Sequence, residues 1–519
     1  MSLHQYHYLM PQGLKPEGIS EFLQSHGIRI RPVHVQSLRR EFFDSFDWRL
    51  YEAHLVLFGD RAGDRVKLHL RSLKDGLDIV AVTTDGPPNF ARGLPRGVLR
   101  DRLTPLLEER RLLPIVAIDR KTRTIDVLDE DEKIVAHVEI ERDSVVTGQR
   151  TRPTALGERV CLAPVRGYPE PLNRLRDLIE RHMGLVRLNG TVLEEALAVT
   201  GRRPLDYSSR PRIALSHDLT AGEAARRIFA ALLAIIEVNE DGVRQDLDVE
   251  FLHDLRVAVR RTRSLLAQWK EILPPECAHY RQEFAWLGEM TGPARDLDVQ
   301  LHDLADYAAL LDIDLRGDLR PLREAVSSRR ESERKRLLEA LASSRYLDLK
   351  QGWRALIEAS NGEAWNTGAM QHPVTSVASA TIRRRHRKVC KLGGGLTLDS
   401  PDAQFHELRK QCKKLRYLLE FFAELYPRGE IKPLLKSLRR LQDNLGTYQD
   451  LSVQIADLPD YAGRMSGAKG AVARARDAVN LLLDRLEARK REIHGEFAAT
   501  WSRFARPSVH DRFARVFAE

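Results

Sequence analysis

Two stretches of the chain place histidine and basic side chains at helical spacing. The first row is His253, Arg256, Arg260 and Arg263, and the second is His406, Arg409, Lys413 and Arg416. At 100° per residue, this spacing confines each row to a band about 80° wide on a helix. No acid lies between Arg256 and Arg263 or between Arg409 and Arg416. Because neighbouring like charges repel by a few tenths of a kcal/mol each, the rows predict a ligand that repeats negative charge.

The residue types of the two rows suit an anionic polymer. Arginine binds phosphate through paired N–H groups, lysine adds a mobile point charge, and histidine can add pH sensitivity. Further basic side chains widen each band at its edge. The expected binding set is His253, Arg256, Arg260, Arg261, Arg263, His406, Arg409, Lys410, Lys413, Lys414 and Arg416.

A second set of residues is a candidate for additional anion binding. It comprises Arg226, Arg227, Arg295, Arg384, Arg387, Lys388 and Tyr417. The acids Asp296, Asp298 and Asp450 follow at matching points after the rows, and we expect them to cap helices or brace the basic rows rather than ligate a metal.

Nucleic acid is an alternative polyanion for the same rows. Proteins that bind single strands stack the bases on aromatic side chains interleaved with basic ones. The neighbourhood of the rows offers only Tyr417 and Trp269. A ligand without bases is therefore favoured, and a nucleic-acid or nucleoid-binding protein stays open as an alternative.

The two rows belong to an internal repeat, which is the strongest organisational signal in the chain. Residues 251–266 match residues 404–419 without a gap, and residues 287–299 match residues 441–453. The offset is 153 residues in the first block and 154 in the second, so order and spacing are both kept. The repeat predicts one ancestral helical unit that has been doubled.

Hydrophobic periodicity predicts that the repeat is built of helices joined by short loops. Thr220, with Glu223 three residues later, is typical of a helix start. Each basic helix should bury a row opposite its charges, namely Leu252, Leu255, Val259 and Leu266 in the first copy and Phe405, Leu408, Cys412 and Leu419 in the second. The expected helices are 221–239, 248–271, 279–291, 295–310, 319–342, 346–358, 374–391, 402–425, 430–446, 448–457 and 468–504.

The N-terminal part has the period-two alternation of strands. Residues 65–71 alternate polar and apolar side chains, and residues 124–128 and 134–141 flank an acidic turn, which predicts a hairpin. Helices are expected near 99–111, 172–183 and 191–199. The fold class is therefore α+β and multidomain, with a small N-terminal β-barrel or tunnel-like α+β domain and a large all-α domain of duplicated helical bundles. The expected bounds are 1–150 for the first domain, 151–215 for a helical and linker segment, 216–505 for the helical domain with repeats at 216–345 and 370–505, and 506–519 for a tail.

Composition sets the broad class of the protein. The net charge of +9 comes from 83 basic and 74 acidic residues, so it only weakly indicates an anionic partner. The longest apolar run, 228–238, is about half of a membrane span, and no targeting segment is visible, so we expect a cytoplasmic protein with no membrane partner. Four widely separated cysteines predict neither disulfides nor a zinc knuckle, and no metal, cofactor or catalytic residue is expected.

The repeated blocks resemble a known family. Residues 253–263 and 406–416 look like the two signature helices of the CHAD domain, the conserved histidine α-helical domain of bacteria and archaea, and residues 294–299 and 445–450 look like the segments that follow. The resemblance covers about 217–505. It implies a pseudo-two-fold pair of helical bundles whose basic cavity binds inorganic polyphosphate, often at polyphosphate granules with other granule proteins. Carried over, the two rows with Arg261 and Lys414 would be the binding residues.

The N-terminal part is similar to a second family. Residues 40–57 resemble the early part of CYTH domains, which are β-barrel tunnels of triphosphatases and adenylate cyclases. The tunnel candidates are Lys67, Arg71, Arg120, Lys121, Glu139 and Glu141. That family begins with a Glu-x-Glu-x-Lys strand that holds a divalent metal. This chain has His4-Gln-Tyr-His-Tyr-Leu9 near its start and no acid before Glu17. We therefore expect a degenerate, noncatalytic relative; the alternative is a metal-dependent inorganic triphosphatase that uses Glu139 and Glu141 instead.

Overall fold

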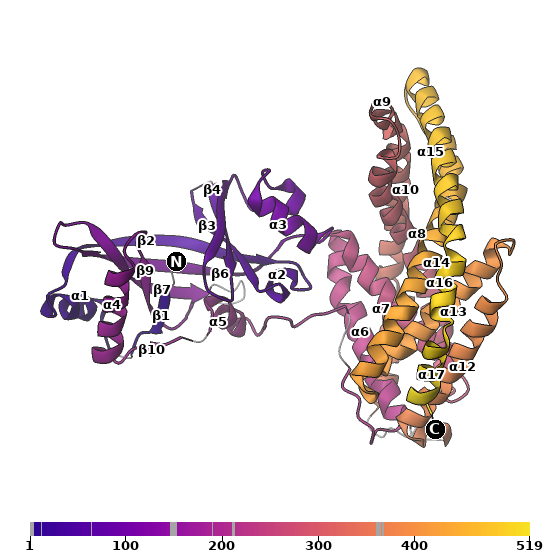
Figure 1. Cartoon of the computed structure of the whole chain (residues 1–519), viewed down its shortest axis with the longest axis horizontal. Coiled ribbons are helices and arrows are strands. Elements are labelled where there is room, and N and C mark those ends of the chain that lie inside the picture. The colour runs from indigo at the N-terminus through magenta and orange to yellow at the C-terminus, as the bar shows by residue number, and fades with distance from the viewer. Residues whose placement is uncertain are drawn as a thin grey trace. The chain divides into compact units, whose positions relative to one another are not determined.

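The computed structural model describes residues 5–11, 13–63, 65–145, 153–188, 190–209, 213–359, 365 and 368–518. His4, from the opening segment, lies outside this part of the chain. Contacts divide the chain into two compact units, Met1–Arg210 and Pro211–Glu519. The first is built on an antiparallel sheet and the second on helices (Figure 1). The α+β multidomain fold class is thus confirmed.

The N-terminal unit is organised around one antiparallel sheet. Its strands are β1 (Tyr6–Leu9), β2 (Arg29–Asp44), β3 (Leu55–Ala62), β4 (Arg65–Ser72), β5 (Asp78–Thr84), β6 (Leu113–Leu128), β7 (Ile134–Val145), β8 (Thr154–Ala155), β9 (Arg159–Pro164) and β10 (Val186–Arg187). The pairing order is β10-β1-β9-β7-β6-β2-β3-β4-β5, and β8 pairs with β7. The predicted hairpin is confirmed, because β6 and β7 pair from Leu128 opposite Ile134 onward.

Helices cover this sheet through three apolar clusters. They are α1 (Pro16–Ser25), α2 (Arg49–Glu52), α3 (Val98–Leu107), α4 (Pro169–His182) and α5 (Val192–Val199). Helices α1 and α4 bury Ile19, Leu23 and Ile179 at one end of the sheet, and α3 buries Leu103 at the other. Helix α5 packs Leu197 onto a third cluster. Alternate side chains of β4 are buried, as the alternation predicts.

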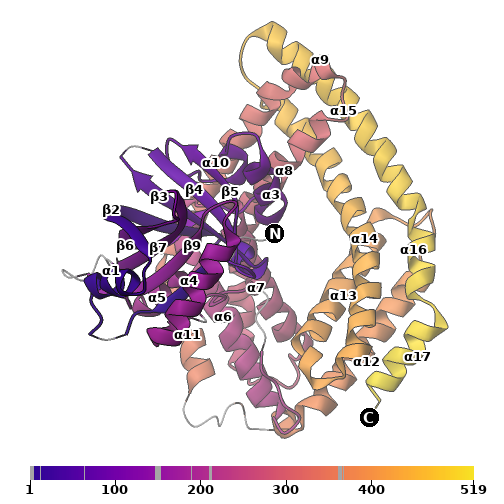
Figure 2. The same cartoon turned by 60° about the vertical axis from the view of Figure 1, so that its left-hand side comes forward.

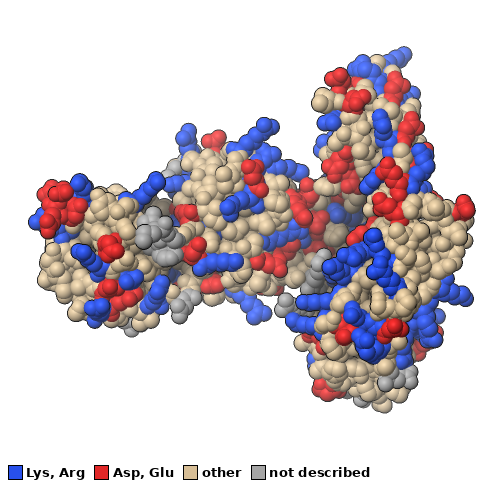
Figure 3. Space-filling model, viewed as in Figure 1, with Lys and Arg blue, Asp and Glu red and all other residues tan. Residues whose placement is uncertain are grey.

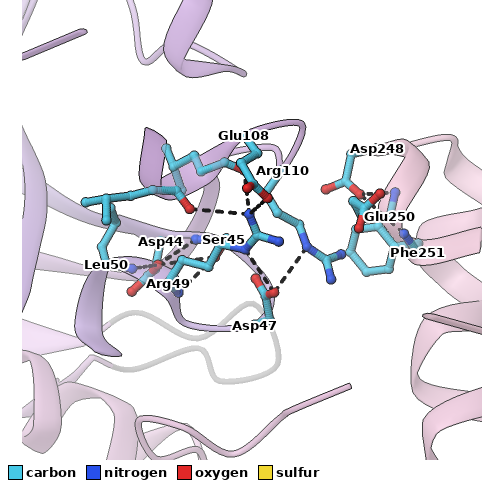
Figure 4. Close-up of polar contacts among 12 residues, drawn as sticks. Asp44, Ser45, Asp47, Arg49, Leu50, Glu108, Arg110, Asp248, Glu250 and Phe251 are labelled. Carbon is cyan, nitrogen blue, oxygen red and sulfur yellow. Dashed lines mark hydrogen bonds and ion pairs between the residues drawn. The ribbon is translucent and has the colours of Figure 1, made fainter. Parts of the chain in front are cut away.

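The turn from β2 into α2 is held by an aspartate. The Asp44 carboxylate accepts hydrogen bonds from the backbone N–H groups of Ser45, Leu50 and Tyr51 at 2.7 to 2.9 Å. Nearby, Asp47 pairs with the guanidinium groups of Arg49 and Arg110, as Figure 4 shows. Asp44 thus ends β2 and begins α2, since its carboxylate supplies free N–H groups of the helix with an acceptor.

The helical unit consists of long helices joined by short connections. They are α6 (Ala221–Gln245), α7 (Val249–Gln268), α8 (Cys277–Ala308), α9 (Ile313–Arg316), α10 (Arg320–Ala342), α11 (Ser344–Glu358), α12 (Val374–Gly394), α13 (Asp402–Phe421), α14 (Arg428–Gly463), α15 (Lys469–Gly495), α16 (Phe497–Phe504) and α17 (Pro507–Val516). The expected capping box of Thr220 and Glu223 begins α6. Asp248 caps α7 by accepting from two backbone N–H groups (Figure 4).

The repeat is visible in the packing of the helices. In Figure 2, α6, α7, α8 and α10 form one side of the helical unit, and α12 to α17 form the other. The two sides meet through reciprocal hydrogen bonds. Gln300 on α8 donates to Asp457 on α14 at 2.9 Å, and Gln454 on α14 donates to Asp303 on α8 at 2.8 Å. Because the repeat offset of 154 relates one pair to the other, the two copies are arranged about a pseudo-two-fold axis.

The apolar rows face inward as predicted. Leu252, Leu255, Val259 and Leu266 on α7 and Phe405, Leu408, Cys412 and Leu419 on α13 are each at most 7% exposed. Their burial fixes the basic rows on the opposite face of the same helices. No helix among the described residues has the length and apolar character needed to cross a bilayer.

Several helix boundaries differ from the sequence predictions. We expected a break at Pro293 and another after Gly446, but α8 and α14 continue through both positions. Proline removes one backbone hydrogen bond, and burial of Leu287 and Leu297 on either side of Pro293 keeps the helix whole. The segment 468–504 is instead divided between α15 and α16 at Glu496, directly after Gly495. Most of the expected tail at 506–519 forms α17, which packs against α12 and α14.

Candidate anion-binding site

The two basic rows meet between α7 and α13. The charge of Arg260 on α7 acts on both Arg409 and Lys413 on α13, and Arg416 acts on Lys413 as well. On α7, Arg256 is in turn affected by Arg260 and Arg263. These six residues form the inner cluster, namely Arg256, Arg260, Arg263, Arg409, Lys413 and Arg416. Figure 3 shows Lys and Arg side chains gathered over the middle of the helical unit, where Figure 1 draws α7 and α14.

Two aspartates brace the inner cluster at equivalent points of the repeat. Arg256 Nη2 lies 3.5 Å from a carboxylate oxygen of Asp296 on α8, and Arg409 Nη2 lies 3.1 Å from Asp450 on α14. Both acids stand inside helices and therefore cap neither. The expectation that they brace the rows is confirmed, and the alternative that they cap helices is wrong. Asp298 is also internal to α8, and it pairs with Arg330 at 2.6 Å.

Several guanidinium groups of the inner cluster keep unused hydrogen-bond donors. Arg256 Nη1 and the Nε atoms of Arg260 and Arg409 are buried without a hydrogen-bond partner among the described residues, and Arg416 Nε lies 3.6 Å from a carboxylate oxygen of Glu420. A buried donor without a partner costs about 1 to 3 kcal/mol. Because these nitrogens are enclosed by neighbouring protein atoms, a ligand could accept hydrogen bonds from them only after the side chains turn toward it.

Glycines of α8 make room for the arginines of α7. A Cβ atom at Gly292 would lie 2.9 Å from Arg256 Nη1, and one at Gly288 would lie 2.4 Å from Arg263 Nη1. At Gly446, which the repeat makes equivalent to Gly292, a Cβ would meet nothing within 4 Å. The first copy therefore holds its arginines closer to the neighbouring helix than the second.

Lys413 is the most perturbed base of the inner cluster. Burial, followed by the charges of Arg260 and Arg409, lowers the pKa of Lys413 to about 7. A lysine in this state loses part of its charge at neutral pH, and a bound polyanion would restore it. Without a ligand, the positive charges of Lys413, Arg260 and Arg409 therefore repel one another.

The two histidines of the rows are half-buried. His406 Nδ1 lies 2.8 Å from Gln449 Oε1, the amide of the residue before Asp450. The amide oxygen accepts only if the proton is on Nδ1, so this contact leaves Nε2 of a neutral ring as an acceptor. His253 occupies the equivalent position on α7.

Other residues of the expected binding set lie apart from the inner cluster. Arg261 is 8% exposed and donates to Glu420 on α13 at 2.8 Å. Its guanidinium therefore joins the two copies rather than facing a ligand. Lys410 pairs with Glu407 at 2.7 Å, and the charges that act on Lys414 are those of Arg385, Glu407, Lys388 and Lys410. Lys410, Lys414, Arg385 and Lys388 thus form a second group on α12 and α13, which we call the outer group.

The additional candidates are distributed over the helical unit. Arg226 and Arg227 on α6 donate to the carbonyl oxygens of Ile357 and Ala214, and Arg295 donates to Glu250. A separate pocket of about 560 Å³ is lined in part by Arg384 and Arg387. Tyr417 is only 2% exposed, with the guanidinium groups of Arg261 and Arg416 near its ring.

A further basic groove lies outside the residues predicted from the sequence. Lys436, Arg440, Arg503 and Arg506 line a groove of about 840 Å³ between α14, α16 and α17. The spacing of Lys436 and Arg440 was a signal available in the sequence. The other two arginines flank the joint between two helices, and only the packing of α17 brings them to the same groove.

Two of the basic tunnel candidates of the N-terminal unit, Arg71 and Arg120, are paired with acids. Arg71, Arg120 and Glu141 line one cavity of about 150 Å³, whereas Lys121 lines a different pocket and Lys67 is exposed. Arg120 binds both Glu141 and Asp143, and its Nε lies 2.8 Å from Asp143. Burial, followed by the charge of Glu141, raises the pKa of Glu139. One carboxylate oxygen of Glu141, Oε1, is thus engaged by Arg120.

Comparison with known families identifies the helical unit. The model of the CHAD domain matches residues 227–458, which include both basic rows. The chain contains a CHAD domain. The match spans α7, α8, α13 and the larger part of α14, so the inner cluster lies within the CHAD domain.

Individual proteins resemble parts of the chain. The uncharacterized proteins Rv2226 and MT2285 of Mycobacterium tuberculosis are each 33% identical to it over 171 residues, which is 32% of this chain and 33% of each relative. The matched part thus spans about a third of the length of these curated relatives.

Solved structures also resemble the chain. The CHAD domain of the plant Ricinus communis is 28% identical with a TM-score of 0.48 and covers 56% of this chain and 95% of its own. PptA from Streptomyces chartreusis is 17% identical with a TM-score of 0.44, and the match covers 55% of this chain and 100% of PptA. HpAC1 from Hippeastrum is described as a putative adenylyl cyclase with a dominant triphosphatase activity. It is 14% identical with a TM-score of 0.26, and the match covers 40% of this chain and 100% of HpAC1.

Proposed function

We propose that the CHAD domain binds inorganic polyphosphate along the inner cluster without turning it over, and that the protein associates with polyphosphate granules. One observation carries the proposal: basic rows from two copies of a repeat act on each other across α7 and α13. Facing rows of like charge are unfavourable without a counter-charge between them. A linear chain of phosphates supplies that charge at regular intervals.

The arginines of the inner cluster support phosphate as the ligand chemistry. Five of its six residues are arginines, and each guanidinium presents a planar fork of N–H donors. Phosphate oxygens accept several hydrogen bonds at once, and charge-assisted bonds of this kind are shorter and stronger than neutral ones. A carboxylate-rich polymer would satisfy fewer donors per unit of length.

The aromatic side chains argue against nucleic acid. Trp269 is 1% exposed and stacks on Phe422, with ring centroids 5.4 Å apart, and Tyr417 is 2% exposed. Neither ring can receive a base without unpacking the core. The alternative of a nucleic-acid or nucleoid-binding protein therefore lacks its stacking surface at this site.

The triphosphatase alternative is disfavoured by the N-terminal cavity. Glu141 is 6% exposed and bound to Arg120, and Asp143 binds both Arg120 and Arg159. The contact with Arg120 neutralises Glu141, one of the two carboxylates that a divalent cation would need. We therefore propose that the N-terminal unit is a degenerate CYTH-like domain without this activity.

The location of the site can be tested with charge-matched variants. Arg260→Gln/Lys413→Gln removes two charges from the inner cluster, and Lys410→Gln/Lys414→Gln removes two from the outer group. We expect the inner variant to weaken binding of labelled long-chain polyphosphate by at least tenfold and the outer variant by much less. Equal losses would mean that net charge, rather than the inner cluster, determines binding.

Two further assays address the rest of the proposal. Incubation with tripolyphosphate and Mg²⁺ should release no phosphate, whereas release that Glu141→Gln abolishes would assign the activity to the N-terminal unit. A fluorescent fusion should co-localise with polyphosphate granules, and the inner variant should not. A diffuse wild-type signal in cells that contain granules would contradict granule association.

A further inference from the structure

Three metal-ligating side chains converge where α17 packs on α12. His386 and Cys390 are one helical turn apart on α12, and His510 comes from α17, 120 residues beyond Cys390. Cys390 Sγ lies 3.3 Å from His386 Nε2 and 3.8 Å from His510 Nδ1. One ligand atom from each of the three residues lies within 4.8 Å of the others.

These separations fit the coordination sphere of a small transition metal. Zinc binds thiolate at about 2.3 Å and imidazole nitrogen at about 2.0 to 2.1 Å in tetrahedral geometry. Tetrahedral angles then place a ligand sulfur and a ligand nitrogen roughly 3.6 Å apart. The observed distances of 3.3 and 3.8 Å lie on either side of that value, so small side-chain rotations would suffice.

The surroundings keep His386 neutral but disfavour the thiolate of Cys390, because burial raises the pKa of Cys390 to about 11 and a metal must displace its proton. His386 is 7% exposed, and its ring stacks on Phe513 with centroids 3.8 Å apart. Burial, followed by the charge of His510, lowers the pKa of His386 to about 4, so the ring is neutral at pH 7. Cys390 and His510 are half-buried, which leaves the cluster open to an ion from solvent.

We propose that His386, Cys390 and His510 form a binding site for a borderline transition-metal ion, with Zn²⁺ as the best match, that fastens α17 to α12. An N₂S donor set suits zinc and cobalt and excludes magnesium and calcium, which prefer oxygen. Binding replaces the S–H bond of Cys390 with a metal–thiolate bond and releases the proton to solvent. Water fills the fourth position. The site lies in the helical unit but uses no residue of the inner cluster.

The chain offers a matched control for the cysteine. Cys161 in the N-terminal unit has His7 Nε2 at 4.0 Å from its sulfur, but no third ligating residue joins this pair among the described residues. A Cys161→Ser variant therefore loses a Cys–His contact while retaining the three-residue cluster. Cys390→Ser loses the thiolate of the cluster.

The test uses the full chain, freed of metal by a chelator and kept reduced with a phosphine. Titration with Co²⁺ should give one equivalent per chain, with a thiolate-to-cobalt charge-transfer band and the visible bands of tetrahedral cobalt. Zn²⁺ should displace it. Cys161→Ser should behave as wild type, Cys390→Ser should lose the charge-transfer band, and His510→Ala should bind at least tenfold more weakly. Absence of the band in wild type, or an unchanged band in Cys390→Ser, would overturn the proposal.

Thermal unfolding separates metal binding from a general folding defect. Zn²⁺ should raise the Tm of wild type and Cys161→Ser and leave that of His510→Ala unchanged. His510 is on α17, so its replacement leaves α12 intact even where Cys390→Ser destabilises the bundle. A Zn²⁺-induced rise in Tm of equal size in His510→Ala would place the ion elsewhere and refute this site.

Discussion

Lys413 should make polyphosphate binding depend on pH. Burial and the charges of Arg260 and Arg409 lower the pKa of Lys413 to about 7 in the unbound protein. At pH 7 about half of the molecules then carry the charge, and at pH 9 about one in a hundred. Bound phosphates favour the charged form, so binding raises the pKa and takes up a proton.

The size of the effect follows from linkage. If bound phosphates return the pKa of Lys413 to its ordinary value of 10.5, affinity should fall about fiftyfold between pH 7 and pH 9, or about 2.3 kcal/mol. The sign is fixed because the pKa is lower in the free state than in the complex. Affinity is therefore greatest below the free pKa and is lost as the pH rises above it.

The assay compares wild type with Lys413→Arg. Arginine stays charged over the whole range, so its affinity for labelled long-chain polyphosphate should be nearly constant between pH 7 and pH 9. Both proteins keep His253 and His406, so the difference between the two profiles isolates Lys413. Parallel profiles would refute the argument that the facing rows perturb this lysine.

Three other consequences can be measured. Gly292→Ala should weaken polyphosphate binding severalfold, because its Cβ would lie 2.9 Å from Arg256 Nη1, although alanine favours the helix by about 1 kcal/mol. Gly446→Ala is the matched control, since its Cβ would meet nothing within 4 Å. Equal effects of the two substitutions on affinity would contradict the close approach of Arg256 to Gly292. Arg261→Met should lower the free energy of unfolding by roughly 2 kcal/mol in denaturant titrations. It removes the shortest contact of the half-buried Glu420, which keeps Arg416 at 3.6 Å and Arg439 at 3.8 Å. A loss of affinity with no loss of stability would instead place Arg261 on the ligand. The logarithm of the binding constant should fall linearly with the logarithm of salt concentration, and each inner-cluster charge that is removed should reduce the slope by about 0.7 to 0.9; a slope unchanged by these variants would mean that they do not contact phosphate.

Much of the helical unit could be predicted because its signals are local or repeated. Spacing along α7 and α13 separates the buried face from the basic face. In both copies of the repeat, the basic row is followed one helix later by an aspartate at the same position. The same reasoning left helix capping and bracing both open for Asp296 and Asp450, and their contacts with Arg256 and Arg409 decide for bracing. Local sequence signals predicted breaks at Pro293 and after Gly446. They do not show whether the side chains around a proline are buried, and burial keeps the helix continuous there.

The division of the basic residues could not be predicted from spacing. Arg261 and Lys414 occupy equivalent positions in the repeat, yet Arg261 is buried against Glu420 while Lys414 joins the outer group. Which face of a helix meets its counterpart depends on tertiary packing that the two copies do not share. The cluster of His386, Cys390 and His510 was missed for a related reason. A search for paired cysteines does not find a single thiol whose second histidine partner lies 120 residues away.

The central claim is that the inner cluster binds a phosphate polymer rather than nucleic acid. The most direct test is an equilibrium titration of labelled long-chain polyphosphate with wild type and with Arg256→Glu/Arg260→Glu/Lys413→Glu at two salt concentrations, with single-stranded DNA of equal charge as competitor. The account predicts tight wild-type binding that weakens with salt, that the triple variant loses, and that DNA barely displaces. Equal binding by both proteins, or ready displacement by DNA, would contradict it.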